Sequence, residues 1–173
     1  MTTAPAEICE VRILGLPLAL QRAAQEQHDE LMREFALLDI ADSAPGRAAV
    51  PRRLRDLIDT LVLRYSSVGE APDAEREAAR SRGEAAVDLV YTTPTAVGPA
   101  CEALLALLDE ADEFCRAGGQ LLTLAAPSQL VAYRHWYLSE FTRQCSGGQP
   151  TSWAAYAGSH PVVPPEQSAP RAM

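Results

Sequence analysis

The stretch PTAVGPACEALLALLDEADEFCRA, residues 94–117, decides the expected fold. Its apolar residues recur every three or four positions, the spacing that places side chains on one face of an α-helix. A first apolar line comprises Val97, Cys101, Leu104, Leu108, Ala111 and Cys115, and a second comprises Ala100, Ala103, Leu107 and Phe114. Together the two lines cover about 180° of the helix. A helix this apolar is either central in a bundle or shared with another subunit.

Similar spacing on both sides of this segment predicts further helices, over residues 17–40, 51–68, 71–82 and 127–146. Proline stands at three of the expected starts and glycine follows several expected ends, as helix termini prefer. Two short apolar runs, residues 8–14 and 86–91, predict strands that could pair as a small ribbon. The expected fold class is therefore mainly α, a bundle of about five helices to which the two strands could add a small two-stranded β ribbon.

The chain divides into one domain and two tails. Residues 1–7 show no periodicity and predict a flexible N-terminal tail, and residues 8–148 form the single helical domain. Residues 149–173 are rich in Pro, Ser, Gly and Ala, a composition typical of disorder. We therefore expect this last segment to be dispensable for folding.

Composition excludes several classes of partner and location. The net charge of −8 disfavours nucleic acid, because phosphate binding needs positive potential. No apolar run approaches the roughly 18–20 residues that span a bilayer, and no secretory signal precedes the domain. The four cysteines include no C-x-x-C pair. A cytoplasmic protein with reduced thiols and no membrane association is expected.

Two residue types are missing altogether. All 15 basic residues are arginine, and the chain contains neither lysine nor asparagine. The absence of lysine excludes a Walker A loop, a protein-kinase catalytic lysine and a Schiff base. The absence of asparagine excludes the metal-binding asparagine of protein kinases and of histidine-kinase-type ATPases. We therefore expect no bound cofactor, no metal and no catalytic residues of these kinds.

One charged pair is expected at the edge of the core. Asp112 lies about 50° from the centre of its apolar stripe, and Arg134 lies about 60° from the centre of its own. The link between their two helices is short, which favours antiparallel neighbours. A charge at such a border is costly to desolvate without a partner. We predict that Asp112 and Arg134 form an ion pair, with Arg116 the alternative partner for Asp112.

A candidate interface combines Leu107, Phe114, Trp136 and His135. Trp136 lies about 100° off the apolar stripe of its helix, which predicts partial exposure, and exposed tryptophan is enriched at binding hot spots. The alternatives are a tryptophan that covers the edge of the core and a solvated His135. His28 is expected to be half-buried, as a packed border residue or as a ligand or pH switch.

Several segments resemble an uncharacterised family of small actinobacterial proteins, over residues 8 to 145. The resemblance is carried by EADEFCR (110–116), LLTL (121–124), YRHWYLSEF (133–141), VRILGLP (11–17), HDEL (28–31) and REFAL (33–37). Genes of that family lie near anti-sigma ATPases and their STAS-domain antagonists, so the resemblance implies a regulatory setting. It implies no activity and no functional residues, and the missing asparagine indicates that this chain is not itself the ATPase.

The sequence thus favours a non-enzymatic regulatory or adaptor protein that acts by protein contact, in stress or sigma-factor signalling. Its partner would be another protein or a second copy, as in a homodimer. The alternative is a small-molecule-sensing or enzymatic domain, with a pocket between helices lined by Cys101, Cys115 and Tyr137. A closed core would favour the first function, and a polar-lined cavity would favour the second.

Overall fold

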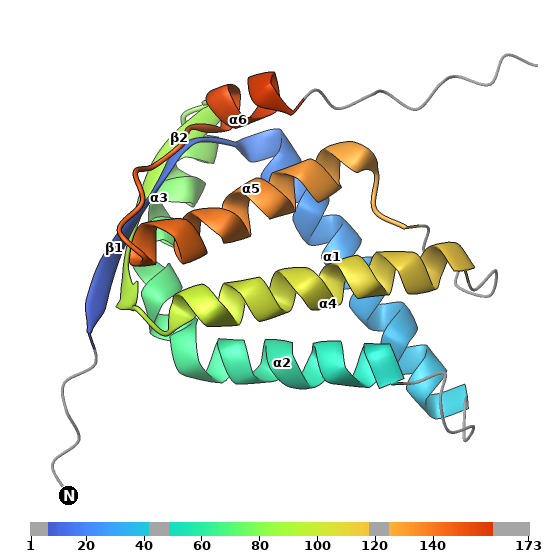
Figure 1. The fold of residues 1–173 in the computed structure, drawn as a ribbon. Coiled ribbons are helices and arrows are strands. Elements are labelled where there is room, and N and C mark those ends of the chain that lie inside the picture. Colours follow the sequence, from blue (N-terminus) through green and yellow to red (C-terminus); the bar gives the residue numbers. More distant parts are fainter. Residues whose placement is uncertain (1–6, 42–48, 118–124, 161–173) are drawn as a thin grey trace, which may run out of the picture.

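The computed structural model describes residues 7–41, 49–117 and 125–160. The elements follow in the order β1 (Ile8–Pro17), α1 (Leu18–Ala41), α2 (Ala49–Tyr65), the 3-10 helix η1 (Ser66–Gly69), α3 (Glu70–Ser81), β2 (Ala86–Pro94), α4 (Val97–Ala117), α5 (Ser128–Cys145) and α6 (Trp153–Ser159). Figure 1 shows the two strands at one side of the molecule, with α2, α4 and α5 extending away from them. The mainly helical class with a small antiparallel sheet is confirmed. A five-helix bundle is not confirmed, because six α-helices lie within the described residues.

The sheet pairs β1 with β2 and buries one of its faces. Val11 lies opposite Tyr91 and Ile13 opposite Leu89, and all four side chains are buried. The register shifts between Ile13 and Leu16, where Gly15 adopts a φ of 67° and its N–H donates to Asp88 Oδ1 at 2.6 Å. Glycine adopts this φ without strain, so the β-bulge returns Leu16 to the buried face. The strand β1 therefore runs past its predicted end at residue 14, and β2 runs past residue 91 because residues 92–94 pair with residues 8–10.

The end of α5 lies along the outer edge of β1. The Arg12 N–H donates to Gln144 Oε1 at 2.9 Å, and Gln144 Nε2 donates to the Arg12 carbonyl at 2.8 Å. One side-chain amide thus replaces the neighbouring strand that β1 lacks on this edge. Beside it, Cys9 and Cys145 are joined by a disulfide, with their Cα atoms 5.4 Å apart. The prediction of four reduced cysteines is wrong for this pair, because the fold brings together residues that lie 136 positions apart.

The buried side chains form two separate clusters. The first joins the inner face of the sheet to α3, to the start of α4 and to α5, and it includes Val11, Leu89 and Trp136. The second joins α1, α2 and the later part of α4, and it includes Phe35 and Leu107. Both α1 and α4 contribute to both clusters. These two helices therefore connect the halves of the molecule.

The wide apolar surface of α4 is explained by its central position. Its neighbours are α5 and α2, between which it lies in Figure 1. Leu107, from the second apolar line, is buried in the cluster with Phe35 and Leu54, and the Phe114 ring lies 6.4 Å from that of Phe35. Of the two expectations for this helix, the central one holds. Ala103, on the second apolar line, stays exposed.

The segment after α5 packs on the domain, contrary to the prediction of a disordered tail over residues 149–173. Trp136 Nε1–H donates to the Thr151 carbonyl at 2.8 Å, and the Trp153 ring lies 5.5 Å from that of Trp136. The buried carboxylate of Glu140 accepts the Thr151 N–H at 3.1 Å. The tail prediction is therefore wrong for residues 149–160, and residues 161–173 lie outside the described residues.

Two other predictions fall partly or wholly outside the described residues. Of the expected N-terminal tail, only Glu7 is described, and its carbonyl accepts the Thr95 N–H at 2.8 Å. Most of the short link expected between the helices of Asp112 and Arg134 is not described, because residues 118–124 lie outside the described ranges. Among the helices that are described, none has the length and apolarity needed to cross a membrane.

Candidate ligand pocket between three helices

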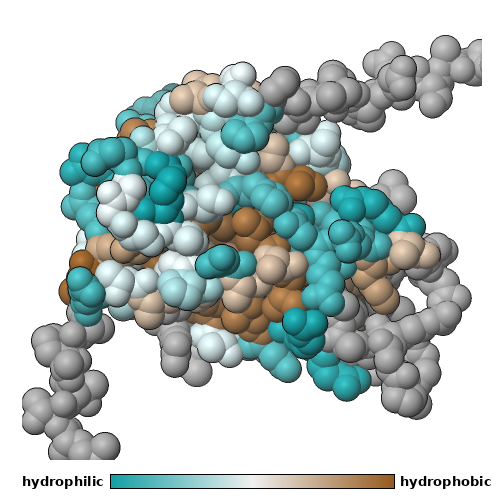
Figure 2. All heavy atoms as spheres, in the orientation of Figure 1, coloured by the Kyte–Doolittle hydropathy of each residue, from teal (hydrophilic) through white to brown (hydrophobic). Residues whose placement is uncertain are grey.

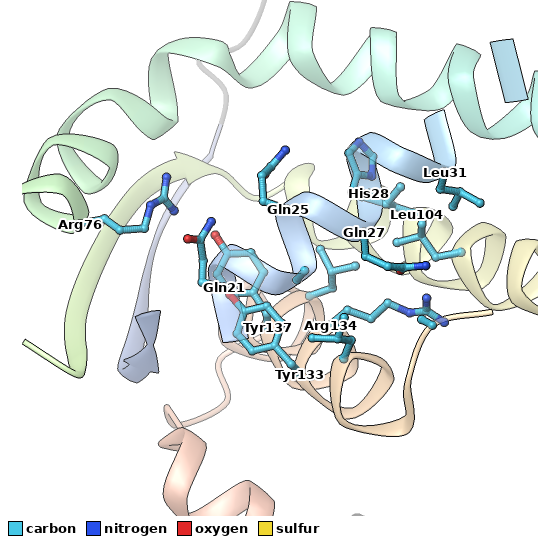
Figure 3. A pocket seen from close by; sticks show the side chains of 15 residues that line it. Gln21, Gln25, Gln27, His28, Leu31, Arg76, Leu104, Tyr133, Arg134 and Tyr137 are labelled. Atoms are coloured by element: carbon cyan, nitrogen blue, oxygen red, sulfur yellow. The ribbon is translucent and has the colours of Figure 1, made fainter. Parts of the chain in front are cut away.

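A pocket of about 340 Å³ lies between α1, α4 and α5, within the size range of small-molecule sites. Its wall is mostly apolar with polar side chains at its borders (Figure 3), and no lining residue is acidic. The lining residues are Gln21, Ala24, Gln25, Gln27, His28, Leu31, Arg76, Leu104, Leu108, Ala126, Leu130, Tyr133, Arg134, Tyr137 and Leu138.

The pocket occupies the junction between the two core clusters. Ala24, Tyr133 and Tyr137 belong to the first cluster or pack against it, whereas Leu31 and Leu104 belong with the second. On α5 the lining side chains recur at helical spacing from residue 130 to residue 138. The same stripe of α5 therefore packs in the first core cluster and also lines the pocket.

Three tyrosines lie at one side of the pocket or behind it. The hydroxyls of Tyr137 and Tyr91 share a hydrogen bond of 2.9 Å. Burial raises the pKa of the Tyr137 and Tyr133 hydroxyls above their usual value, and Arg76 offsets this only in part. Both phenols are therefore neutral at physiological pH. Figure 3 places Arg76 and Gln21 on this side, with the two tyrosine rings below them.

Arg134 and His28 lie on the opposite side of the pocket in Figure 3. Arg134 Nη2 lies 2.5 Å from Asp112 Oδ2 and 2.5 Å from Asp109 Oδ1, so the ion pair expected from the helix geometry is present. Asp112 Oδ1 also accepts the Ala126 N–H at 3.1 Å. Arg134 Nε is buried and has no hydrogen-bond partner among the described residues. This N–H faces no open space, so an acceptor could reach it only if neighbouring side chains moved.

The remaining polar groups at the pocket come from α1. Arg80 donates a hydrogen bond to Gln21 Oε1, which leaves the Gln21 amide N–H groups as donors. Burial lowers the pKa of the His28 imidazole below its usual value, and the charge of Asp29 offsets this only in part. His28 is therefore neutral at pH 7. The arrangement is suited to holding a small molecule by its apolar body and orienting it by hydrogen bonds.

Comparisons of this chain with protein-family models, with curated proteins and with solved structures find no match. No cluster of histidine, cysteine or acidic side chains in the described part of the chain could hold a metal ion. The assignment of the site therefore rests on its own geometry.

The side chains of the candidate interface do not form one surface. Trp136 is 0% exposed and Leu107 is buried, so both belong to the core. The Phe114 ring contacts that of Phe35. His135 Nε2 lies 3.0 Å from Asp109 Oδ1, next to the Arg134 ion pair. The prediction that Trp136 is partly exposed is wrong, because α6 covers the side of α5 that had no expected neighbour.

Of the three residues expected to line a pocket, only Tyr137 lines this one. Cys101 borders a separate hollow between α4 and α5, and Cys115 does not line the pocket. The sequence did not single out Gln21, Arg76 or Tyr133 as pocket residues. Tyr133 lies at helical spacing from Leu130 and Tyr137, a pattern that is equally typical of core. Arg76 comes from α3, and no local sequence pattern predicts where that helix packs.

Proposed function

We propose that this protein is a small-molecule-binding domain, in which a ligand sits between α1, α4 and α5. The observation that carries the proposal is a cavity of about 340 Å³ with apolar walls and hydrogen-bonding groups on two sides. The cavity expected of a ligand-sensing domain was polar-lined, whereas this one has apolar walls and polar side chains only at its borders. Its position between the two core clusters means that a bound ligand would contact both halves of the molecule.

The test fills the pocket without altering the surface. Ala24 lines the pocket, so Ala24→Phe should occupy part of its volume. Ala19 lies on the same helix, is exposed and does not line the pocket, so Ala19→Phe is the matched control. We expect a ligand-detected NMR screen of small molecules to give binders for the wild type and for Ala19→Phe, and to lose them with Ala24→Phe. An absence of binders, or binders that persist with Ala24→Phe, would refute the proposal.

A second candidate function is regulation by protein contact. Figure 2 shows apolar atoms gathered in the middle of one face, over α4 and its border with α5. Val62 on α2 and Leu37 on α1 are also more than half exposed, at 61% and 62%. Apolar surface of this kind suits a protein partner or a second copy. An adaptor role in a regulatory setting, which the family resemblance implies, is part of this proposal.

The protein-contact function has its own test. Val62→Glu introduces a charge at an exposed apolar position without touching the pocket. If the surface around Val62 binds a second copy, light scattering should give a dimer mass for the wild type and a monomer mass for Val62→Glu. A monomer mass for both proteins would count against self-association.

A further inference from the structure

The sheet, at one side of the molecule in Figure 1, has an open edge on β2. Among the described residues the sheet contains only β1 and β2, so β2 has a neighbouring strand on one side alone. The Val90 side chain is 52% exposed, and those of Asp88 and Thr92 on the same face are exposed as well. No described helix therefore covers this face of the strand.

The main chain of β2 presents hydrogen-bonding groups along the open edge. Both main-chain groups of Arg12 bond to Gln144, on the side of β1 that faces away from β2. In an antiparallel pair, two residues directly opposite each other either exchange main-chain hydrogen bonds or both turn their groups outward. Val90 lies opposite Arg12, so its N–H and carbonyl point away from β1. The same holds two positions away, at Asp88 and Thr92.

The strand β2 lacks the features that usually block an open edge, which are lysine, an internal proline, a bulge or very short length. It has nine residues, and its only proline is the last of them. The register shift of the sheet lies in β1. The single charged side chain of β2, Asp88, accepts the Gly15 N–H across the sheet. An added strand could therefore pair with β2 from Asp88 to Thr92.

An acidic hollow adjoins the start of this edge. It has a volume of about 390 Å³ and is lined by Gly15, Glu75, Glu84, Ala86, Val87 and Asp88. Three of these side chains are carboxylates. The Arg82 guanidinium lies 2.9 Å from Glu75 Oε1 and 2.7 Å from Glu84 Oε1, and it balances only one of the three negative charges. The hollow therefore favours a cationic side chain.

We propose that β2 receives an extended segment of another protein as a third strand, with a basic side chain of that segment in the acidic hollow. Main-chain hydrogen bonds to the open edge supply the affinity, and the charge of the hollow selects the segment and fixes its register. A β-branched side chain two positions along the segment lies beside Val90. This docking site is separate from the pocket between α1, α4 and α5 and does not depend on it.

A second copy of this chain fits the edge less well than a basic segment does. Its β2 contains no basic residue, so pairing of β2 with itself would bring no cation to the hollow. Its β1 carries Arg12, but the outward main-chain groups of that residue are already bonded to Gln144. The charge of the hollow thus indicates a different protein as the partner.

The test uses three peptides, blocked at both termini, of sequence X-Val-Thr-Val-Thr-Val-X, in which X is Arg, Gln or Glu. With X at both ends, either strand direction places it near the hollow. Dissociation constants are measured by NMR titration at low salt, followed at the Val90 and Thr92 amide signals. We expect the Arg peptide to bind about fivefold more tightly than the Gln peptide, and the Glu peptide to bind most weakly. Saturation with the Arg peptide should slow hydrogen exchange at both amides by about tenfold.

Two changes separate strand addition from other modes of binding. Val90→Pro removes one outward N–H at a position where an edge strand tolerates proline, and it should abolish binding of the Arg peptide. Val90→Thr keeps that N–H and should bind as the wild type does. An Arg peptide that is N-methylated at its internal residues lacks their donors and should not bind. This peptide leaves the protein unchanged, so it decides the point even if Val90→Pro fails to fold.

A charge variant tests the hollow. Glu84→Gln removes one of its carboxylates and should reduce the preference for the Arg peptide over the Gln peptide by about threefold. Glu70→Gln makes the same charge change at an exposed position of α3 that does not line the hollow, and it should leave the preference unchanged.

Four other results would overturn the inference, and none of them bears on the small-molecule pocket. Equal affinities of the Arg and Glu peptides would reject the hollow as the selecting feature. Equal affinities of the Arg peptide and its N-methylated form would reject strand addition. Slow exchange at Val90 and Thr92 in a wild-type dimer without peptide would show that a second copy occupies the edge. If no peptide binds, the edge is not a docking site for a basic segment.

Discussion

At the scale of single residues, Asp112 is one of two buried carboxylates among the described residues. Its side chain is 5% exposed, and it both pairs with Arg134 and accepts the Ala126 N–H just before α5. One carboxylate therefore ties the last turns of α4 to the start of α5. The pair could be predicted because helical periodicity fixes the direction of both side chains. The roles of Asp109 and Ala126 could not, because they depend on how α4 and α5 cross.

A double-mutant cycle tests this pair. Asp112→Ala should cost about 3–5 kcal/mol of unfolding free energy, because it leaves the buried Arg134 without its innermost carboxylate. The coupling energy with Arg134→Ala should be about 1–3 kcal/mol. Arg53 and Glu110, an exposed pair that also involves α4, serve as the control, with an expected coupling of about 0–1 kcal/mol. Equal coupling in the two cycles, measured by urea unfolding, would contradict the assignment.

His28 should make stability depend on pH. Burial lowers the pKa of His28 in the folded state, whereas in the unfolded chain it titrates near 6.5. Between these two values the unfolded state binds more protons, so stability falls as the pH drops below 6.5 and levels off below the folded pKa. Urea unfolding at pH 7.5 and 5.5 should show a larger loss for the wild type than for His28→Gln. Equal losses would show that His28 does not contribute.

At the scale of elements, α6 is the part of the fold that completes the core. Without α6 and the residues that lead into it, Trp136 would lose the Trp153 ring and the Thr151 carbonyl, and Glu140 would lose the Thr151 N–H. The long helices were predictable because proline, glycine and apolar spacing act locally. The helix α6 has only seven residues, and it is held by a tryptophan on another element, so its local sequence carries little signal.

Truncation measures the contribution of α6. A chain ending at Gly148 should lose about 3–5 kcal/mol of unfolding free energy, the scale of removing a buried large aromatic side chain. Trp136 would then be the only tryptophan, and its fluorescence should shift to the red. A chain ending at His160 keeps all the contacts described for α6 and should behave as the full-length protein does. Equal stability of the two truncated chains would show that α6 does not support the core.

At the scale of the whole molecule, the fold consists of two core clusters connected by α1 and α4, with a pocket where they meet. The sequence could predict that α4 is apolar over about half its circumference, but not which neighbour covers which side. It also could not predict the pocket, because its wall is built from the same apolar stripes that build the core. The long-range Cys9–Cys145 bond likewise depends on the complete topology.

The disulfide should contribute to global stability. Reduction is expected to lower the unfolding free energy by about 2–5 kcal/mol. The double variant Cys9→Ala/Cys145→Ala should be less stable to a similar extent and insensitive to reductant. Burial raises the pKa of the Cys101 thiol to about 12, so Cys101 stays protonated at neutral pH and should not exchange with the bond. A wild-type midpoint that reductant leaves unchanged would contradict the prediction.

The position of this disulfide also determines how the domain responds to a mechanical force. A tether pulled from the two ends of the chain would load the Cys9–Cys145 bridge and leave β1 through α5 inside an unstretched ring. Cleaving the bridge under tension would add roughly 450 Å of contour length, at about 3.3 Å per residue over the 136 positions that it spans. In the oxidised protein only the segments outside this ring, α6 among them, can extend, whereas in the reduced protein the ring can extend as well.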